Sequence, residues 1–302
     1  MRKPTLIHRA EYLGVKIFVR TVRVFPAGFA LRLAGLAGTL VFDVVGYRRS
    51  VALSNLKRHL EGRVPEAGRG RRGIGYSRIG RESCRNLIMG LAEFARLPLV
   101  DSKYIKRHIQ IDGLENLDRA LASGKGAILV TGHFGSWELT GCVLARLGYP
   151  MIYLVGVQRN PLVQQLMEEV RSSCGIAIIE PHRLLAVPKS LKSNHFVAML
   201  SDQDAGRKGV FVEFLGEPAS TPRGAAHLSI LAGCPIIPGF IVRTTGLGHR
   251  IVIEKPIYPP EAPGEAALRE LTQAYTRVIE SYVRQHPGQW LWTHRRWKTR
   301  PA

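Results

Sequence analysis

The 302-residue sequence predicts an α/β fold: a mainly parallel sheet flanked by helices, preceded by an N-terminal hydrophobic helical segment that associates with a membrane. From residue 106 onward, short apolar runs alternate with amphipathic stretches, which is the pattern of a parallel sheet covered on both faces. Near the N-terminus, residues 24–42 are almost uninterruptedly apolar. We therefore expect membrane-associating helices over 1–62, a Gly/Arg-rich loop over 63–80 and an α/β domain over 81–302.

The apolar segment, "VFPAGFALRLAGLAGTLVF", has basic residues on both flanks and one charge inside, Arg32. About 20 apolar residues are needed to span a membrane, and a central arginine is costly there unless it snorkels or pairs. A helix lying in the membrane interface is therefore favoured over a spanning one. A buried core helix is the alternative. A signal peptide is not indicated, because no small-residue cleavage site follows closely.

The next segments connect this helix to the domain. Residues 50–62, "SVALSNLKRHLEG", have leucines at helical spacing. Residues 61–80 hold six glycines and five arginines, which indicates an exposed basic loop. This loop is either a linker or a contact for an anionic surface. A helix is expected at about 77–97.

The domain itself consists of alternating strands and helices. Strands are expected at 107–113, 126–132, 151–156, 195–202, 209–216, 234–242 and 249–255. Helices are expected at 114–124, 137–148, 161–175, from about 222, and at 264–288. In such sheets, ligands bind beyond the carboxyl ends of the strands.

The stretch "ILVTGHFGSWEL" (128–139) places candidate catalytic residues at that edge. An apolar strand ends in His133, Ser136 can cap the following helix, and Glu138 falls in its first turn. A carboxylate hydrogen-bonded to an imidazole orients it and makes it a better base, so His133 and Glu138 are candidate catalytic residues. On spacing alone, an incidental histidine beside a capped helix is the commoner case. The chain has no G-x-S-x-G motif, so a serine acyl-enzyme is not indicated.

A second group of polar residues lies in the block 200–240. Asp202 and Asp204 follow a strand, and "ASTPRG" offers Ser220 or Thr221 as a helix start, where free amides bind anions. Two carboxylates alone could suggest a metal, but no further ligand set is visible, so neither a metal nor a cofactor is expected. The alternative is that the two carboxylates pair with nearby arginines.

The net charge and the cysteine content indicate the kind of partner and the redox compartment of the protein. With 43 Lys and Arg against 23 Asp and Glu, the net charge is +20, which points to an anionic partner. Cys84, Cys142, Cys174 and Cys234 form no C-x-x-C pair, which argues against a disulfide framework or a zinc site and fits a reducing compartment.

Several blocks together resemble the bacterial lipid A late acyltransferase family, within the lysophospholipid acyltransferase superfamily. They are "TGHFGSWEL", "NPLVQQLMEEVRSS", "SDQDAG" with the following "GVFVEFLGEPASTPRGAAHL", "GCPIIPGF" and "WLWTHRRWKTRP", in family order over roughly 110–300. The segment 61–80 departs from the family, where a helical stretch near the membrane is common.

The resemblance implies transfer of a fatty acyl chain, usually from acyl carrier protein, to a hydroxyl of a glycolipid at the cytoplasmic face of the inner membrane. The family's H-x4-D/E pair matches His133 and Glu138, its arginine matches Arg171, and its third-block acid matches Asp202. Candidate substrate contacts are Arg171, Asp202, Asp204, Ser220, Thr221 and Arg223. The reaction expected is direct attack by the acceptor hydroxyl, without a covalent acyl-enzyme.

Acyl carrier protein, lipid A precursors and the inner leaflet are all anionic and suit the +20 charge. Three alternatives remain open: an acceptor that is another glycolipid or a lysophospholipid, a non-catalytic membrane-binding relative, and a nucleic-acid-binding protein. The last is suggested only by charge and by the alternating Trp and Arg residues of the C-terminal tail, which either pack on the domain or stack on bases; no nucleic-acid motif accompanies them.

Overall fold

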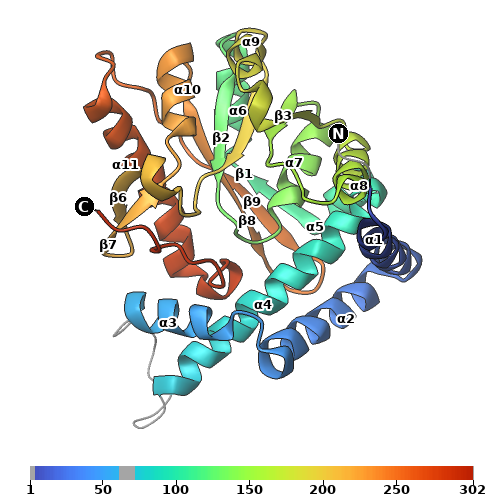
Figure 1. The fold of residues 1–302 in the computed structure, drawn as a ribbon. Coiled ribbons are helices and arrows are strands. Elements are labelled where there is room, and N and C mark those ends of the chain that lie inside the picture. Colours follow the sequence, from blue (N-terminus) through green and yellow to red (C-terminus); the bar gives the residue numbers. More distant parts are fainter. Residues whose placement is uncertain (1–3, 61–71, 302) are drawn as a thin grey trace.

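The computed structural model describes residues 4–60 and 72–301 of the chain (Figure 1). Its first part is helical. The elements are α1 (Leu6–Val24), α2 (Ala27–Leu40) with a π-helical turn η1 (Val41–Val45), α3 (Arg49–His59), α4 (Arg72–Arg96), the 3-10 turn η2 (Leu97–Leu99) and α5 (Ser102–His108).

A seven-stranded sheet follows, in the order β1-β9-β8-β2-β5-β3-β4. Neighbouring strands are parallel except β8 and β9, which are antiparallel, so the predicted mainly parallel sheet is confirmed. The strands are β1 (Ile109–Asp112), β2 (Ala127–Thr131), β3 (Met151–Leu154), β4 (Ala177–Ile179), β5 (Phe196–Leu200), β8 (Ile236–Arg243) and β9 (His249–Ile253). A separate hairpin pairs β6 (Val210–Phe214) with β7 (Glu217–Thr221).

Helices cover both faces of this sheet (Figure 1). They are α6 (Leu114–Ala122), α7 (Trp137–Arg146), α8 (Pro161–Ser172), α9 (Ala186–Lys192), α10 (Gly224–Ala232) and α11 (Glu265–Gln285), with short 3-10 turns η3 (Pro181–Arg183), η4 (Gly206–Lys208) and η5 (Pro287–Gln289). The central strand β2 shows how the two layers arise. Ile128 and Val130 pack into the hydrophobic cluster that contains α10 and α11 residues, whereas Ala127 and Leu129 pack into the cluster of α6 and α7 residues. Successive side chains point to opposite faces, so each of the four residues 127–130 is buried in one layer or the other.

The N-terminal helices rest on α4 rather than on the sheet (Figure 1). Ala30, Leu31 and Ala34 of α2 are buried against Ala92 and Ala95 of α4 and against α1. The two helices approach closely at Gly38, where a Cβ would lie 2.6 Å from a backbone atom of Arg85, so only glycine fits there. The opposite side of α2 is exposed and is apolar apart from Arg32.

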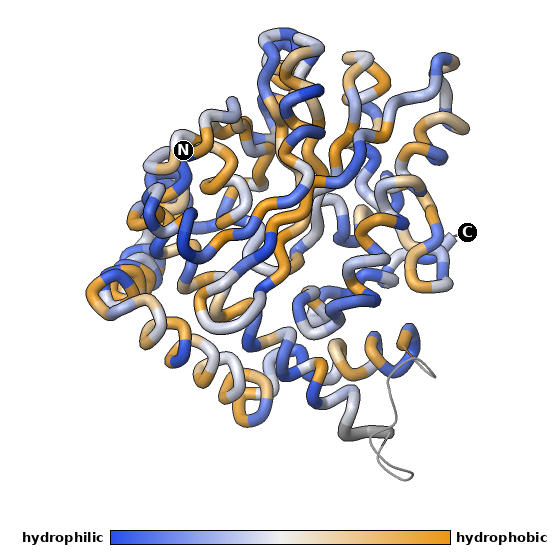
Figure 2. The backbone as a smooth tube through the Cα atoms, turned by 180° about the vertical axis from the view of Figure 1, so that it is seen from behind, coloured by the Kyte–Doolittle hydropathy of each residue, from blue (hydrophilic) through white to orange (hydrophobic). Residues whose placement is uncertain are grey.

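Figure 2 shows hydrophobic positions gathered in the central strands and along α2 at the edge of the molecule. In the described part of the chain, Ala27–Val45 is the one helix long and apolar enough to cross a membrane, and about a third of it is buried inside the protein. The predicted N-terminal apolar helix is therefore present, and it has two different faces.

Two boundaries differ from those predicted. Residues 61–71 of the predicted Gly/Arg-rich loop lie outside the described residues, but 72–80 belong to α4, because Ile79 is buried and Gly80 meets the ring of Phe42. The helix expected to start at Ser220 or Thr221 begins at Gly224, and these two residues instead end strand β7. Strands β4 and β7 and helices α5 and α9 were not predicted.

The cysteines also differ from expectation. Cys142 of α7 and Cys174, just after α8, form a disulfide with a Cα–Cα distance of 5.2 Å, which is an ordinary separation for this bond. Cys84 and Cys234 are free and buried. The bond joins the helix that carries Glu138 to the end of the helix that carries Arg171.

Candidate active site

The turn after β2 presents His133 at the carboxyl edge of the sheet. The turn needs glycine at Gly135, which has φ of 57° and a position where a Cβ would meet the carbonyl oxygen of Ile241 at 1.9 Å. The C-terminal segment holds the turn from the other side: Leu291 N–H donates to the His133 carbonyl, and Gly135 N–H donates to the Gln289 carbonyl. His133 is therefore fixed by two segments more than 150 residues apart in the chain.

The carboxylate partner of His133 is Asp202. His133 Nδ1 lies 2.8 Å from Asp202 Oδ1, and the His133 backbone N–H donates to Oδ2 at 2.7 Å. The register of the sheet explains this meeting. Parallel strands β2 and β5 pair Thr131 with Leu200, so His133 and Asp202 each lie two residues beyond the paired strand ends.

Asp202 is buried and held as an anion. Burial alone would raise the pKa of its carboxyl, but the charge and hydrogen bonds of His133 and the indole N–H of Trp290, at 2.8 Å, bring that pKa below its ordinary value. A carboxylate on Nδ1 favours the tautomer in which Nδ1 carries the proton, which leaves Nε2 as the basic nitrogen. Gln203 Nε2 lies 3.3 Å from that nitrogen.

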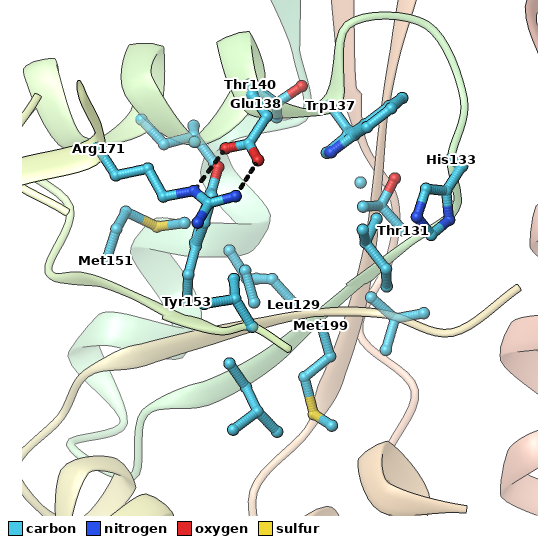
Figure 3. A pocket seen from close by; sticks show the side chains of 18 of the residues that line it. Leu129, Thr131, His133, Trp137, Glu138, Thr140, Met151, Tyr153, Arg171 and Met199 are labelled. Atoms are coloured by element: carbon cyan, nitrogen blue, oxygen red, sulfur yellow. Dashed lines mark hydrogen bonds and ion pairs between the residues drawn. The ribbon is translucent and has the colours of Figure 1, made fainter. Parts of the chain in front are cut away.

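Glu138 does not orient His133, and here the predicted contact is wrong. Glu138 lies in the first turn of α7 and forms a two-pronged ion pair with Arg171 of α8, at 2.6 and 3.2 Å (Figure 3). Both side chains are largely buried. The Arg171 guanidinium is thus engaged by Glu138, whereas Asp202 is bonded to His133 and Trp290.

A cavity of about 560 Å³ joins these groups. His133 and Trp137 border one part of it, and Glu138 and Arg171 another (Figure 3). Most of the remaining wall is apolar and comes from the sheet and from α7; it includes Leu129, Leu144, Met151, Ala198, Ile237 and Ile253. The volume is typical of a small-molecule site, and a mostly apolar wall with a few polar groups suits an amphiphilic ligand.

The other predicted substrate contacts lie elsewhere. Asp204 accepts hydrogen bonds from Thr299 and anchors the C-terminal segment. The buried Ser220 carbonyl and the Thr221 hydroxyl accept from Arg296, and Arg223 pairs with Glu265 at 2.6 Å on the surface. These residues do not line the cavity described above, so the position of the cavity does not support their expected role in substrate binding.

Two residues beside His133 were not predicted as part of the site, Trp290 and Gln203. Gln203 follows Asp202 directly, so its position beyond the β5 strand end could have been noticed. Trp290 is 157 residues from His133 in sequence, and no local signal identifies it. Among the described residues there is no group of three or more His, Cys, Asp or Glu side chains suited to a metal ion.

Comparisons with known proteins agree on one family. The family model of the bacterial lipid A biosynthesis acyltransferases matches residues 2–299. The lipid A biosynthesis palmitoleoyltransferase of Escherichia coli is 32% identical over 225 residues, covering 73% of this chain and 72% of that protein. The lipid A biosynthesis lauroyltransferase of the same organism is 30% identical over 218 residues, covering 70% and 69%.

More distant similarities extend beyond lipid A enzymes. The phosphatidylinositol mannoside acyltransferase of Mycobacterium tuberculosis is 26% identical over 215 residues, covering 68% of this chain and 66% of that protein. Among solved structures, the 1-acyl-sn-glycerophosphate acyltransferase PlsC from Thermotoga maritima aligns over 85% of this chain and 97% of its own, with a TM-score of 0.38 and 13% identity. The match over nearly the whole chain shows that this protein is an acyltransferase of the bacterial lipid A biosynthesis acyltransferase family.

Proposed function

We propose that this protein is a membrane-associated O-acyltransferase that moves a fatty acyl chain from an acyl thioester to a hydroxyl of a lipid A-type glycolipid. The observation that carries the proposal is His133 at the edge of a largely apolar cavity, with its Nδ1 bonded to a buried carboxylate at 2.8 Å. An oriented neutral imidazole is a general base, and the apolar wall suits an acyl chain.

The reaction follows from these positions. His133 Nε2 takes the proton of the acceptor hydroxyl as its oxygen attacks the thioester carbonyl carbon. The C–S bond then breaks, the thiolate leaves, and the imidazolium returns the proton to sulfur, so the products are an ester and a free thiol. Asp202 stabilises the transient imidazolium and keeps the ring in place, as a buried carboxylate does in other imidazole-based sites. No acyl-enzyme is formed.

Glu138 and Arg171 have a separate role in this scheme. Their ion pair lies in the wall of the cavity and satisfies two charges that would otherwise be buried alone. We assign them the task of holding α7 against α8 and of supplying a polar part of the cavity wall. His133 is thus the base, and Asp202 rather than Glu138 is its orienting partner.

The acyl donor in this proposal is acyl carrier protein. That partner is acidic, and a chain with net charge +20 attracts it over distances of about a Debye length. The similarity to lipid A palmitoleoyl and lauroyl transferases supports a lipid A-type acceptor. The second candidate acceptor is another glycolipid or a lysophospholipid, supported by the similarity to phosphatidylinositol mannoside acyltransferases.

Helices α1 and α2 support attachment to a membrane surface. Both helices expose apolar side chains, which include Leu6, Leu13, Ile17, Leu33, Leu36, Leu40 and Val44. The same helices also expose the basic residues Arg9, Lys16, Arg20 and Arg32, which suit an anionic surface. The inner side of α2 packs along α4, which carries Glu82, Arg85, Glu93 and Arg96 and is unsuited to a lipid core. This arrangement favours a helix lying in the interface over one that spans the bilayer.

The cavity opens beside this layer. Its wall includes Val157, which is exposed, and Gln158 in the loop before α8. Asn160 at the start of α8 donates to the carbonyl of His8 and to Glu11, both on α1, at 2.9 Å. We place this side of the molecule against the anionic cytoplasmic leaflet of the inner membrane, where a glycolipid hydroxyl reaches His133 without leaving the bilayer.

The test is acyl transfer by the purified protein in mixed micelles. Acyl carrier protein loaded with a fatty acid is the donor, and a lipid A precursor, a phosphatidylinositol mannoside and a lysophospholipid are compared as acceptors by mass spectrometry. The His133→Ala variant should lose about 10²–10⁴ in rate, because it lacks the general base. A folded His133→Ala protein with near-normal transfer would rule out this mechanism, and the acceptor with the highest kcat/KM decides the substrate class.

A further inference from the structure

A second cavity lies between α3 and the C-terminal segment. It measures about 330 Å³ and shares no lining residue with the cavity of His133. Its described wall is strongly basic and polar; the residues are Ser50, Val51, Ser54, Asn55, Arg58, His59, Arg295, Trp297, Lys298 and Arg300. We call it the basic pocket.

The charges of the basic pocket are poorly balanced. Its described lining contains Arg58, Arg295, Lys298 and Arg300 but no carboxylate. Glu217, adjacent to it, pairs with both Arg58 and Arg300. The ion pairs found among the described residues include neither Arg295 nor Lys298, and both side chains belong to exposed residues. One carboxylate therefore faces four cations, which is the composition of an anion site.

Neutral hydrogen-bond donors complete this composition. Ser50 and Ser54 contribute hydroxyls, and both belong to α3, which begins at Arg49 with no side-chain cap. The first turn of a helix presents free backbone amides and the positive end of the helix dipole. A tetrahedral anion with several oxygens, such as a phosphate, uses cations and hydroxyl donors together.

The walls of the basic pocket are held rigidly. Arg296 points inward, is fully buried and donates to Ser220 and Thr221, so its neighbours Arg295 and Trp297 are fixed in register. The Trp297 ring stacks on His59 of α3 with a centroid distance of 3.5 Å. Asn55 of α3 donates to the carbonyls of Trp292 and His294. Two segments about 240 residues apart thus form one preorganised site.

The position of the basic pocket indicates where its ligand comes from. Helix α3 begins four residues after the π-turn that ends the apolar helix, and Val44, Val45 and Tyr47 in this connection are all more than half exposed. If α2 lies in the membrane interface, α3 begins at the level of the lipid phosphates. This step rests on the membrane attachment proposed above; the charge and shape of the pocket do not.

We propose that the basic pocket binds the phosphomonoester group of an anionic membrane lipid, as distinct from the phosphodiester of a zwitterionic lipid such as phosphatidylcholine. Arg295 and Lys298 are its principal cations, and the α3 hydroxyls donate to the remaining phosphate oxygens. The same C-terminal segment carries Trp290, which bonds to Asp202, so one segment supports both the basic pocket and His133.

The experiment measures binding of the full-length protein to vesicles. Three kinds are compared: phosphatidylcholine alone, phosphatidylcholine with phosphatidic acid, and phosphatidylcholine with oleate at the same surface charge. The test variant is Arg295→Gln/Lys298→Gln. The control variant is Lys189→Gln/Lys192→Gln, which removes the same charge from exposed positions on α9, at the opposite end of the molecule from α3 (Figure 1).

We expect the wild type and the control to prefer phosphatidic acid over oleate vesicles. The test variant should lose this preference, with affinity for phosphatidic acid vesicles lowered about tenfold, or about 1.4 kcal/mol. An equal loss on both anionic vesicles would show non-specific attraction and overturn the proposal. So would an intact preference accompanied by lost binding of acyl carrier protein, which would assign the pocket to an acidic protein.

Two further measurements distinguish a lipid phosphate from free phosphate, and the basic pocket from the membrane attachment. If soluble pyrophosphate stabilises the wild type but not the test variant, and no vesicle preference exists, the pocket takes free phosphate and the lipid assignment is wrong. Binding of the wild type to phosphatidylcholine alone reports on membrane attachment through α1 and α2. Failure of that attachment is therefore distinguishable from failure of the basic pocket.

Discussion

At the scale of single residues, the pair of His133 and Asp202 makes the sharpest prediction. Replacing Asp202 with Asn keeps the shape of the side chain but removes the negative charge that holds Nδ1–H. We expect kcat to fall about 10²-fold or more with little change in KM, because the imidazole loses its favoured tautomer and the stabilisation of its protonated form. Steady-state kinetics measure kcat and KM separately and so check this expectation.

Asp202 acts through His133, so a second readout separates positioning from folding. The ¹⁵N shifts of the His133 ring should report protonated Nδ1 in the wild type and a mixture of tautomers in Asp202→Asn. Asp204→Asn is the matched control: Asp204 accepts bonds from Thr299 rather than from His133, so its loss should lower stability more than kcat. If both variants had the same kcat, the orienting role of Asp202 would be refuted.

The residue scale also shows what a sequence can reveal about such a site. His133 could be predicted, because a glycine turn after a buried strand places it at the ligand-binding edge. Its partner could not be predicted from spacing. Glu138 is near in sequence, but helix α7 turns its carboxylate toward Arg171, whereas Asp202 is 69 residues away and is brought close by the pairing of β2 with β5. Asp202 lies beside His133 because β5 is next to β2 in the sheet, and this strand order cannot be read from the sequence.

At the scale of elements, a buried ion pair attaches α4 to the sheet. Glu93 of α4 forms a two-pronged ion pair with Arg243 of β8, and His249 of β9 lies 3.2 Å away. Replacing Glu93 with Gln leaves the buried Arg243 without its counter-charge, which typically costs about 3–5 kcal/mol of unfolding free energy. Urea denaturation at neutral pH measures this loss. Glu82→Gln, on an exposed part of the same helix, should cost less than about 1 kcal/mol.

The difference in unfolding free energy between the wild type and Glu93→Gln should depend on pH in one direction. Burial alone would raise the pKa of Glu93, but His249 and Arg243 bring it well below its ordinary value of 4.5. A group with a lowered folded-state pKa contributes stability that is present above its unfolded pKa and is lost as the pH falls below it. The stability gap between wild type and Glu93→Gln should therefore shrink as the pH falls below 4.5, where the carboxyl of the unfolded chain becomes protonated. A gap that widens with acid would contradict the charge-based account.

The elements that the sequence predicted are those whose pattern is strong. Apolar runs such as Ala127–Thr131 and long amphipathic stretches such as Glu265–Gln285 were placed within a few residues. The missed strand β4 has three residues, and β7 begins with Glu-Pro, which read as a loop. These strands depend on pairing with β3 and β6, so their conformation comes from tertiary contacts rather than from local preference.

At the scale of the whole molecule, the exposed apolar side chains, the basic pocket and the cavity of His133 belong to different parts of the structure. Exposed apolar side chains lie on α1 and α2, and the basic pocket follows at α3. The wall of the His133 cavity includes Val157 and Gln158, which shortly precede Asn160, the residue that contacts α1. Deleting residues 1–47 is a poor test of membrane attachment, because it also removes the buried face of α2 from α4. Substitutions on the exposed face alone leave that packing intact.

Leu36 and Leu40 are suitable positions for such substitutions, because they are 59% and 58% exposed on α2. Full burial of a leucine contributes about 1.5–3 kcal/mol, so inserting these exposed halves into a bilayer contributes roughly 1 kcal/mol each. Leu36→Gln/Leu40→Gln should weaken binding to phosphatidylcholine vesicles by about 2 kcal/mol, roughly 30-fold, with unchanged circular dichroism. Leu147→Gln/Leu231→Gln, at exposed leucines of other helix ends, is the matched control and should bind like the wild type. If the control lost as much affinity as the α2 variant, the membrane contact would have to be spread over the molecule, and α2 would be a surface helix without a special role.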